Sequence, residues 1–405
     1  DRNFFSATKI LAKERGECPD GIGYGVRNSH LLAIAPNASS SIICGNTSPS
    51  IEPYRANAFV QKTKTGSSLL KNEYLEHCLD EIGMNTNEIW QSIITHDGSV
   101  QHLDFLDKDT KFIKAVDGIS FNLDEGETLG IVGESGSGKS TAARTLLRLE
   151  VPTSGSVHFK QKNLVDLSET EIRNLRKEMQ MIFQDPFSSI NPRRKIGEVL
   201  SEPFEIHDIK ENICESVKEL LNQVGLSPNH AYRYPHEMSG GQLQRVGIAR
   251  AIALRPSLVV ADEPVSALDV SVQAQVINLM GDLKEKLGIS YLFISHDMGV
   301  VEYFCDRVAV MYLGKIVEMA PTELLNRKAA HPYTQALLAS KPSLDPTDRK
   351  RFQPLQGDVP SPISPPSGCH FHPRCPKAED RCKTEIPSQI ELEEGHMVTC
   401  HLYNG

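Results

Sequence analysis

Apolar and polar residues alternate most regularly in the C-terminal three quarters of the chain. Short apolar runs predict strands buried on both faces at residues 128–132, 180–183, 257–261 and 290–294. Charged or amphipathic segments predict helices at residues 141–149, 172–179 and 197–225. Residues 115–121 alternate as a half-buried strand does. This succession predicts an α/β fold with a parallel sheet covered by helices, and a small helical subdomain.

Composition narrows the class of protein. The chain has 405 residues, of which 39% are hydrophobic and 23% charged, values typical of a globular protein of two to three domains. No apolar run approaches about 18 residues, so we expect no membrane-spanning segment, and the first residues predict no secretion signal. The net charge of -9 argues against nonspecific nucleic-acid binding, which requires a basic surface. Any phosphate-binding site must therefore be local.

A glycine-rich loop between a predicted strand and a predicted helix is the strongest single signal. The backbone N–H groups of such a loop surround phosphate oxygens, and Gly136 and Gly138 permit the close approach. Lys139 is placed to reach the terminal phosphates, and the Ser140 hydroxyl to ligate Mg²⁺. The predicted nucleotide-binding residues of this loop are Gly133, Glu134, Ser135, Gly136, Ser137, Gly138, Lys139, Ser140 and Thr141.

Two acidic residues follow the apolar run at 257–261. Asp262 can hold magnesium through water, and Glu263 can orient and deprotonate the attacking water. Apolar strands often end in acidic residues, so this pair is informative only together with the glycine-rich loop.

A second glycine-containing segment begins a helix at Ser239, Gly240, Gly241 and Gln242. The free N–H groups at the start of a helix form an anion-binding site. One chain therefore has two such sites, the glycine-rich loop and this segment. Both are needed only if they bind different ends of the nucleotide or if they serve the ATP of different subunits. The segment resembles the signature motif of the ATP-binding cassette (ABC) ATPases, with Met238 in place of the commoner leucine. The resemblance implies a P-loop, RecA-like core in which two cassettes face each other and each signature closes on the ATP held by the other.

Three further positions match that family in order and spacing. Gln184 matches the glutamine that senses magnesium and the membrane partner, Asp269 belongs to the loop that communicates across the dimer, and His296 matches the histidine that contacts the γ-phosphate. The residues that the resemblance implies in catalysis are Glu263, His296 and Gln184. Those that it implies in binding Mg²⁺ are Ser140, Gln184 and Asp262.

The resemblance narrows to the oligopeptide and dipeptide importers, and it covers residues 111–405. The segments that carry it are 183–193, 234–237, 357–362 and 369–376. The parts that it implies are an ATPase domain at 111–335, a helical subdomain within it near 187–245, and a C-terminal extension at 336–405.

This branch implies ATP hydrolysis that powers peptide import, although nickel and glutathione importers share the same extension. The implied partners are permease subunits, a second ABC ATPase and, indirectly, a peptide-binding protein, with no nucleic acid. The expected location is the cytoplasm, at the inner face of the cell membrane.

Four of the nine cysteines lie in the extension, and their odd total without a secretion signal predicts a reducing compartment. Cys369, Cys375, Cys382 and Cys400 follow the spacing C-x5-C-x6-C-x17-C. In the importer branch these cysteines are associated with an iron-sulfur cluster. The spacing itself leaves a four-iron cluster, a zinc site and unligated thiols open, and the lack of a C-x2-C pair makes zinc less natural.

Residues 1–110 do not continue the α/β pattern. Segments 21–29, 36–41, 45–53 and 97–106 are similar to the large subunit of class I ribonucleotide reductase, in which 36–41 would correspond to the loop that grips the substrate diphosphate. The similarity implies an α/β fragment of the reductase barrel. The half of the active site that carries the radical cysteine is missing, so we expect no reductase activity. Local patterning predicts a strand at 31–35 and a helix at 73–83 with Leu75, Leu79 and Ile82 inward.

The abrupt change near Thr110 keeps other hypotheses open: a nonfunctional chimeric product, or a residual reductase-type nucleotide site. The junction also replaces the leading strand that, in the ABC family, carries an aromatic residue stacked on adenine. Phe105 or Phe112 could substitute, but we expect a core position for each. The loss of stacking predicts a weakened affinity for ATP, since a stacked base contributes about 1 to 3 kcal/mol in other base-binding proteins.

Overall fold

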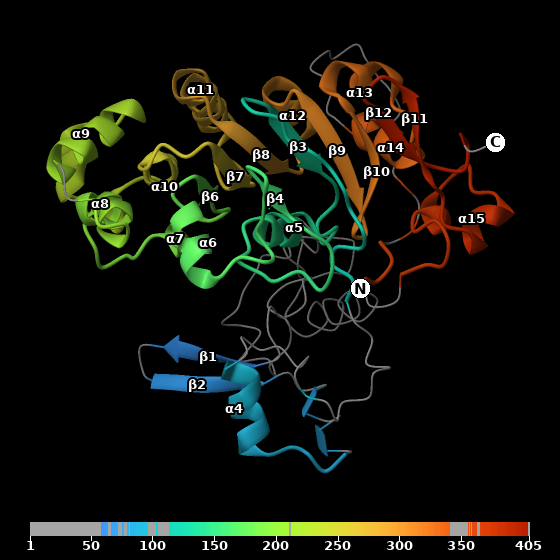
Figure 1. The fold of residues 1–405 in the computed structure, drawn as a ribbon, viewed down its shortest axis with the longest axis horizontal. Helices are drawn as coiled ribbons and strands as arrows, with labels where there is room; N and C mark the ends of the chain where they lie inside the picture. The colour runs from blue at the N-terminus through green and yellow to red at the C-terminus, as the bar shows by residue number, and fades with distance from the viewer. Residues whose placement is uncertain are drawn as a thin grey trace, which may run out of the picture. The chain divides into compact units, whose positions relative to one another are not determined.

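The computed structural model describes most of the chain from residue 113 onward and parts of the residues before it (Figure 1). The described residues are 58–63, 66–71, 75–76, 79–80, 82–95, 103, 113–209, 212–340, 355, 357, 359–362 and 365–403. The chain divides into two compact units, residues 1–110 and 111–405, and each is described by itself. The predictions on 31–35, 36–41, Phe105 and Phe112 lie outside the described residues.

The first unit contains a hairpin and a helix. Strand β1 (Ala58–Thr63) pairs antiparallel with β2 (Gly66–Lys71). Helix α4 (Asn87–Thr95) buries Trp90 and Ile93 in a small apolar cluster that includes Leu79. Leu79 is fully buried as predicted, but the prediction for Ile82 was wrong, because that side chain is 49% exposed in the turn that precedes α4.

The second unit is built on a mixed sheet that has, among the described residues, the strand order β11-β12-β10-β9-β3-β8-β7-β6. Its strands are β3 (Thr128–Val132), β6 (Met179–Ile182), β7 (Leu258–Asp262), β8 (Ser290–Ser295), β9 (Arg307–Tyr312), β10 (Lys315–Pro321), β11 (Gln389–Glu393) and β12 (His396–Thr399). Strands β9, β3, β8, β7 and β6 run parallel, which confirms the predicted parallel core. Strands β10, β12 and β11 extend it antiparallel. A separate short pair joins β4 (His158–Phe159) to β5 (Lys162–Asn163).

The strand predicted at 115–121 is absent from the structure, in which these described residues form turns and loop. The reason is that β3 already has a parallel partner on each side, β9 and β8, so that neither of its edges is free. The segment instead runs beside the β9–β10 turn, where the Asp117 N–H donates to the Gly314 carbonyl at 2.8 Å.

Two apolar layers cover the sheet because successive strand residues point to opposite faces. Val259 and Phe293 belong to one buried cluster, and Val260 and Leu292 to the other.

The helices of the second unit are α5 (Lys139–Leu146), α6 (Glu169–Leu175), α7 (Pro186–Ser189), α8 (Ile196–Ile206), α9 (Ile213–Gln223), η2 (Pro228–Tyr232), η3 (Pro235–Glu237), α10 (Gly240–Ile252), α11 (Val270–Leu287), α12 (Met298–Phe304), α13 (Thr322–Lys328), α14 (Pro332–Ala339), η4 (His372–Arg374) and α15 (Asp380–Thr384). Among the described helices, none combines the length and apolar character that a membrane crossing requires.

Helices α8, α9 and α10 pack against one another, and Figure 1 shows α8 and α9 grouped beyond the β6 end of the sheet. Their apolar periodicity produces this packing: Leu200, Leu221 and Leu243, one from each helix, are fully buried in the same cluster.

The C-terminal extension is anchored to the core by the sheet and by a buried polar cluster. Strand β12 pairs with β10. The Glu318 carboxylate, fully buried on β10, accepts hydrogen bonds from the N–H groups of Ala330 and His331 at 2.7 and 2.9 Å. His396 Nε2 of β12 lies 2.8 Å from the same carboxylate. Its partners satisfy a charge that would otherwise be costly to bury, and they join the extension to the core.

Candidate nucleotide site

The loop between β3 and α5, called here the phosphate loop (residues 133–140), has a backbone that requires glycine at two positions. A Cβ at Gly138 would lie 2.0 Å from the Ala115 carbonyl oxygen, and the residue has a φ of +101°. A Cβ at Gly133 would lie 2.1 Å from the Met311 carbonyl oxygen. The loop therefore packs tightly against its surroundings, while Ser135 and Gly136 at its tip are exposed and leave their backbone open to a ligand.

Lys139 is held beneath the phosphate loop. Its side chain is buried, and Nζ donates hydrogen bonds to the carbonyl oxygens of Gly133 and Glu134, both at 2.9 Å. These bonds fix the ammonium group at the base of the loop, so that its charge is in place before any phosphate binds.

The structure brings together Ser140, from the first turn of α5, and Asp262, from the end of β7. The Ser140 hydroxyl donates to Asp262 Oδ1 at 2.9 Å. Asp262 is 3% exposed, and burial, only partly offset by this hydrogen bond, raises its pKa above the ordinary value. Two oxygen ligands at this separation suit Mg²⁺, and a bound cation would favour the ionised carboxylate.

Glu263 lies at the centre of the second predicted group. Its Oε2 accepts a hydrogen bond from Gln184 Nε2 at 3.0 Å and lies 3.3 Å from His296 Nδ1. The residue has a φ of +45°, in the left-handed region, and its N–H donates to the Ile294 carbonyl at 3.0 Å. The structure thus brings together all three residues predicted to act in catalysis.

The His296 ring and the Glu263 carboxylate affect each other's charge. The hydrogen bond to His296 holds the pKa of Glu263 below its ordinary value, although burial opposes the shift. The same bond raises the pKa of His296. At neutral pH Glu263 is therefore an ionised hydrogen-bond acceptor, the form required to orient a water molecule and accept its proton.

The second glycine-containing segment, called here the signature segment (residues 239–242), caps a helix of the helical group. Ser239 is the N-cap of α10: its Oγ accepts from the Gln242 N–H at 3.3 Å, and Gln242 Oε1 accepts from the Ser239 N–H at 3.0 Å. Helix α10 packs on α7, α8, α9 and α11 and also on strand β6, whereas α5 packs on β7 and β8. Asp269, the N-cap of α11, is exposed. The two anion sites therefore lie at the starts of two helices with different packing partners.

The four cysteines of the extension do not fit a metal site. Among the described residues, which include all four, no group of three or more Cys, His, Asp or Glu side chains could hold a metal ion. Burial raises the pKa of Cys369 to about 11 and also raises that of Cys375 and Cys400, whereas metal ligation requires thiolates. The described residues do not support the predicted iron-sulfur cluster or a zinc site.

Sequence reasoning missed two residues that contact the phosphate loop. The Tyr333 hydroxyl accepts a hydrogen bond from the Glu134 N–H at 2.9 Å, and the Arg374 guanidinium pairs with the Glu134 carboxylate. The sequence carries no local signal for either contact, since 199 and 240 positions separate the partners.

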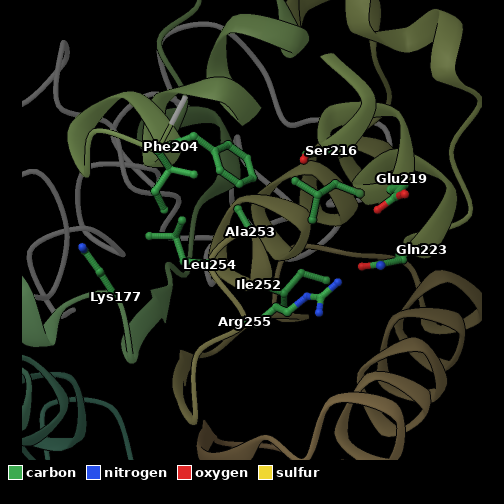
Figure 2. Close-up of a pocket in the computed structure, with 11 residues that line it drawn as sticks. Lys177, Phe204, Ser216, Glu219, Gln223, Ile252, Ala253, Leu254 and Arg255 are labelled. Carbon is green, nitrogen blue, oxygen red and sulfur yellow. The ribbon is translucent and has the colours of Figure 1, made fainter. Parts of the chain in front are cut away.

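Figure 2 shows a cavity of about 240 Å³ that is separate from this site. It lies between α8, α9 and the chain that follows α10, and Phe204, Ser216, Glu219 and Arg255 are among its lining residues. No residue of the phosphate loop or of the Glu263 group lines it.

Three families match different parts of the chain. Residues 116–266 match the family model described as ABC transporter, and residues 317–382 match the one described as oligopeptide/dipeptide transporter, C-terminal region. Residues 19–117 match the ribonucleotide reductase barrel domain.

Curated relatives resemble the chain over most of their own length. The probable peptide ABC transporter ATP-binding protein y4tS of Sinorhizobium fredii is 53% identical over 292 residues, which are 72% of this chain and 83% of that protein. The oligopeptide transport ATP-binding protein AppF of Bacillus subtilis is 54% identical over 298 residues, 72% of this chain and 90% of that protein. Among solved structures, cbiO1 from Clostridium perfringens, part of the ABC transporter complex cbiONQ, is 28% identical with a TM-score of 0.49 and covers 53% of this chain and 85% of that chain.

Proposed function

The chain belongs to the family of ATP-binding subunits of peptide ABC transporters, and from that premise we propose that it hydrolyses ATP to power the import of dipeptides or oligopeptides. The observation that carries the proposal is the assembly at the carboxyl ends of β3, β7 and β8. There Ser140 contacts Asp262, and Glu263 contacts both Gln184 and His296, beside an exposed phosphate loop.

The phosphate loop and Lys139 bind the triphosphate of ATP. The backbone N–H groups of the loop tip face the phosphates, and the ammonium group offsets their charge. Mg²⁺, held by Ser140, Gln184 and Asp262, would neutralise charge on the β- and γ-phosphates. Gln184 bonds Glu263 through Nε2, which leaves its Oε1 as the atom that would face the cation.

Glu263 orients the water that attacks the γ-phosphate, and its ionised state at neutral pH makes it a ready acceptor. His296 stands beside it with an exposed ring, from which it can contact the γ-phosphate. The Glu263–His296 contact keeps both groups in place before the nucleotide arrives.

A second cassette completes the site. The signature segment starts α10, whose packing partners differ from those of α5, so we assign it to the ATP of a facing subunit, either another copy of this chain or a sister ATPase. Asp269, exposed at the start of α11, communicates across the same interface. Permease subunits dock near Gln184 and the helical group, and a peptide-binding protein acts through them. This arrangement places the chain in the cytoplasm, at the inner face of the cell membrane.

The proposed domains are an ATPase domain at 111–335, with a helical subdomain near 187–245, and an extension at 336–405. We assign no metal cluster to the extension, because its thiols are not grouped for one. Residues 1–110 belong to a fragment of the reductase barrel, to which we assign no catalysis. The net charge of -9 supports a function without nucleic acid.

Two measurements test this function. Phosphate release by the purified full chain with Mg-ATP should be measurable and should be lost in Glu263→Gln. Reconstitution with permease subunits in vesicles should then give ATP-dependent uptake of labelled dipeptides or oligopeptides. Uptake of Ni²⁺ or glutathione in place of peptides would contradict the peptide assignment, and a chain without ATPase activity would contradict the whole proposal.

A further inference from the structure

The C-terminal extension contacts the phosphate loop directly at Glu134. Arg374 Nη1 donates to Glu134 Oε2 at 2.7 Å, and Nη2 donates to Oε1 at 3.0 Å. The Arg374 side chain, at the end of η4, is only 6% exposed, against 28% for Glu134. A pair of parallel charged hydrogen bonds fixes both the position and the orientation of the carboxylate.

An aromatic cluster supports this pair. The Tyr312 ring lies 4.7 Å from Tyr333 and 5.2 Å from Phe371, centroid to centroid, and the Arg374 guanidinium lies 5.9 Å from the Tyr312 ring. Burial raises the pKa of Tyr333, so its hydroxyl stays neutral where it accepts the Glu134 N–H. Both the backbone and the side chain of Glu134 are therefore held by residues outside the phosphate loop.

The extension has a second route to the phosphate loop. His370 Nδ1 lies 3.1 Å from the Leu313 carbonyl oxygen in the β9–β10 turn. The next residue of that turn, Gly314, donates its N–H to the Ser137 carbonyl at 2.9 Å. The extension thus contacts the loop directly at Glu134 and, through the β9–β10 turn, indirectly at Ser137.

Glu134 also places a carboxylate in the loop that binds phosphate. An unpaired carboxylate beside the phosphate loop would repel the triphosphate, and Arg374 offsets it. The Glu134 carbonyl in turn accepts from Lys139 Nζ, so a shift of Glu134 would move a partner of that ammonium group. We propose that Arg374 is a positioning residue for the phosphate loop, through which the extension sets the affinity for ATP. This inference rests on the proposed function only for the identity of the nucleotide.

Hydrogen exchange in the nucleotide-free full chain tests the positioning role. Arg374→Ala should accelerate exchange in peptides that cover residues 133–138. Lys328→Ala is the matched control, because it removes an exposed pair with Glu393 that also joins the core to the extension, and it should leave those peptides unchanged. Unchanged exchange in Arg374→Ala would overturn the proposal. This readout does not depend on ATP, so it separates the inference from the proposed function.

Titration with Mg-ATP tests the effect on affinity. Arg374→Ala should weaken binding roughly tenfold, as expected for the loss of hydrogen bonds to a charged group, and Arg374→Lys should weaken it less. Adding Glu134→Gln to Arg374→Ala should recover part of the affinity, since the uncompensated charge is then gone. A merely structural loss would not be rescued in this way. Equal affinity in the parent and Arg374→Ala, or no recovery in the double variant, would contradict the proposal.

Discussion

The phosphate loop and the signature segment both contain glycine and both start a helix, yet their surroundings in the structure differ. The phosphate loop is surrounded by its own chain: Lys139 is buried beneath it, and Arg374 and Tyr333 hold Glu134. The signature segment is capped within α10, Ser239 is exposed, and a Cβ at Gly241 would lie 2.6 Å from Val272 of α11. The first is a site prepared by one chain, and the second becomes a nucleotide site only when another subunit supplies the ATP.

The largest expected effect comes from Glu263→Gln, which leaves the phosphate loop and the signature segment unchanged and removes the carboxylate that contacts Gln184 and His296. Turnover should fall by about 10²- to 10⁴-fold, the usual contribution of a positioned base. ATP affinity should stay close to that of the parent, because the loop and Lys139 are unchanged. Phosphate release and nucleotide titration measure the two effects, and turnover near the parental rate would contradict the role of Glu263.

Ser239→Asp addresses the signature segment alone. Aspartate is as good an N-cap as serine, so α10 should be preserved, but its charge would repel a facing triphosphate. We expect turnover to fall by roughly 100-fold, an effect of the size that loss of a charged hydrogen bond gives, with no change in ATP binding by a single chain. Ser239→Asn is the control, since it also caps the helix and adds no charge. Equal turnover in the two variants would show that the segment does not face phosphate.

Lys139→Ala addresses the phosphate loop alone. Removal of the ammonium group should weaken Mg-ATP binding by roughly 10- to 100-fold, as measured by calorimetric titration. Circular dichroism should show that the fold persists. An affinity for Mg-ATP equal to that of the parent would mean that Lys139 holds the loop in place and does not bind the nucleotide.

Asp262→Asn should have the smallest effect, and it is a gain: the substitution should raise the stability of the fold. Burial raises the pKa of Asp262, so the ionised carboxylate destabilises the nucleotide-free fold at neutral pH. The neutral amide still accepts from Ser140 and avoids this penalty, and each kcal/mol gained raises the Tm by about 2 to 4 °C. The gain should be largest near pH 7, and it should vanish as the pH falls well below 3.8, the ordinary pKa of the carboxyl, because the carboxyl is then neutral in both the folded and the unfolded chain. Thermal melts across pH measure it, and a lower Tm at pH 7 would refute this reasoning.

The same contrast explains what the sequence could predict. Strand β3, the phosphate loop and α5 were predictable because their chemistry is local, with glycines, a lysine and a serine in consecutive positions. The antiparallel strand β11 was not predicted: its five residues do alternate polar and apolar, but the strand is short and largely exposed, and it pairs with β12 at the edge of the described sheet. The Arg374–Glu134 pair joins residues 240 positions apart, so no local pattern shows it. Grouping of the four cysteines was expected from the resemblance and is not supported by the geometry.

Mixing two inactive variants tests the central claim most directly, namely that the phosphate loop and the signature segment of one chain serve different ATP sites. Full chains that carry Lys139→Ala or Ser239→Asp should each show little phosphate release. In an equimolar mixture, mixed dimers contain one site with both parts intact, so the rate should rise well above the sum of the separate rates. A mixture that releases no more phosphate than that sum would contradict the account.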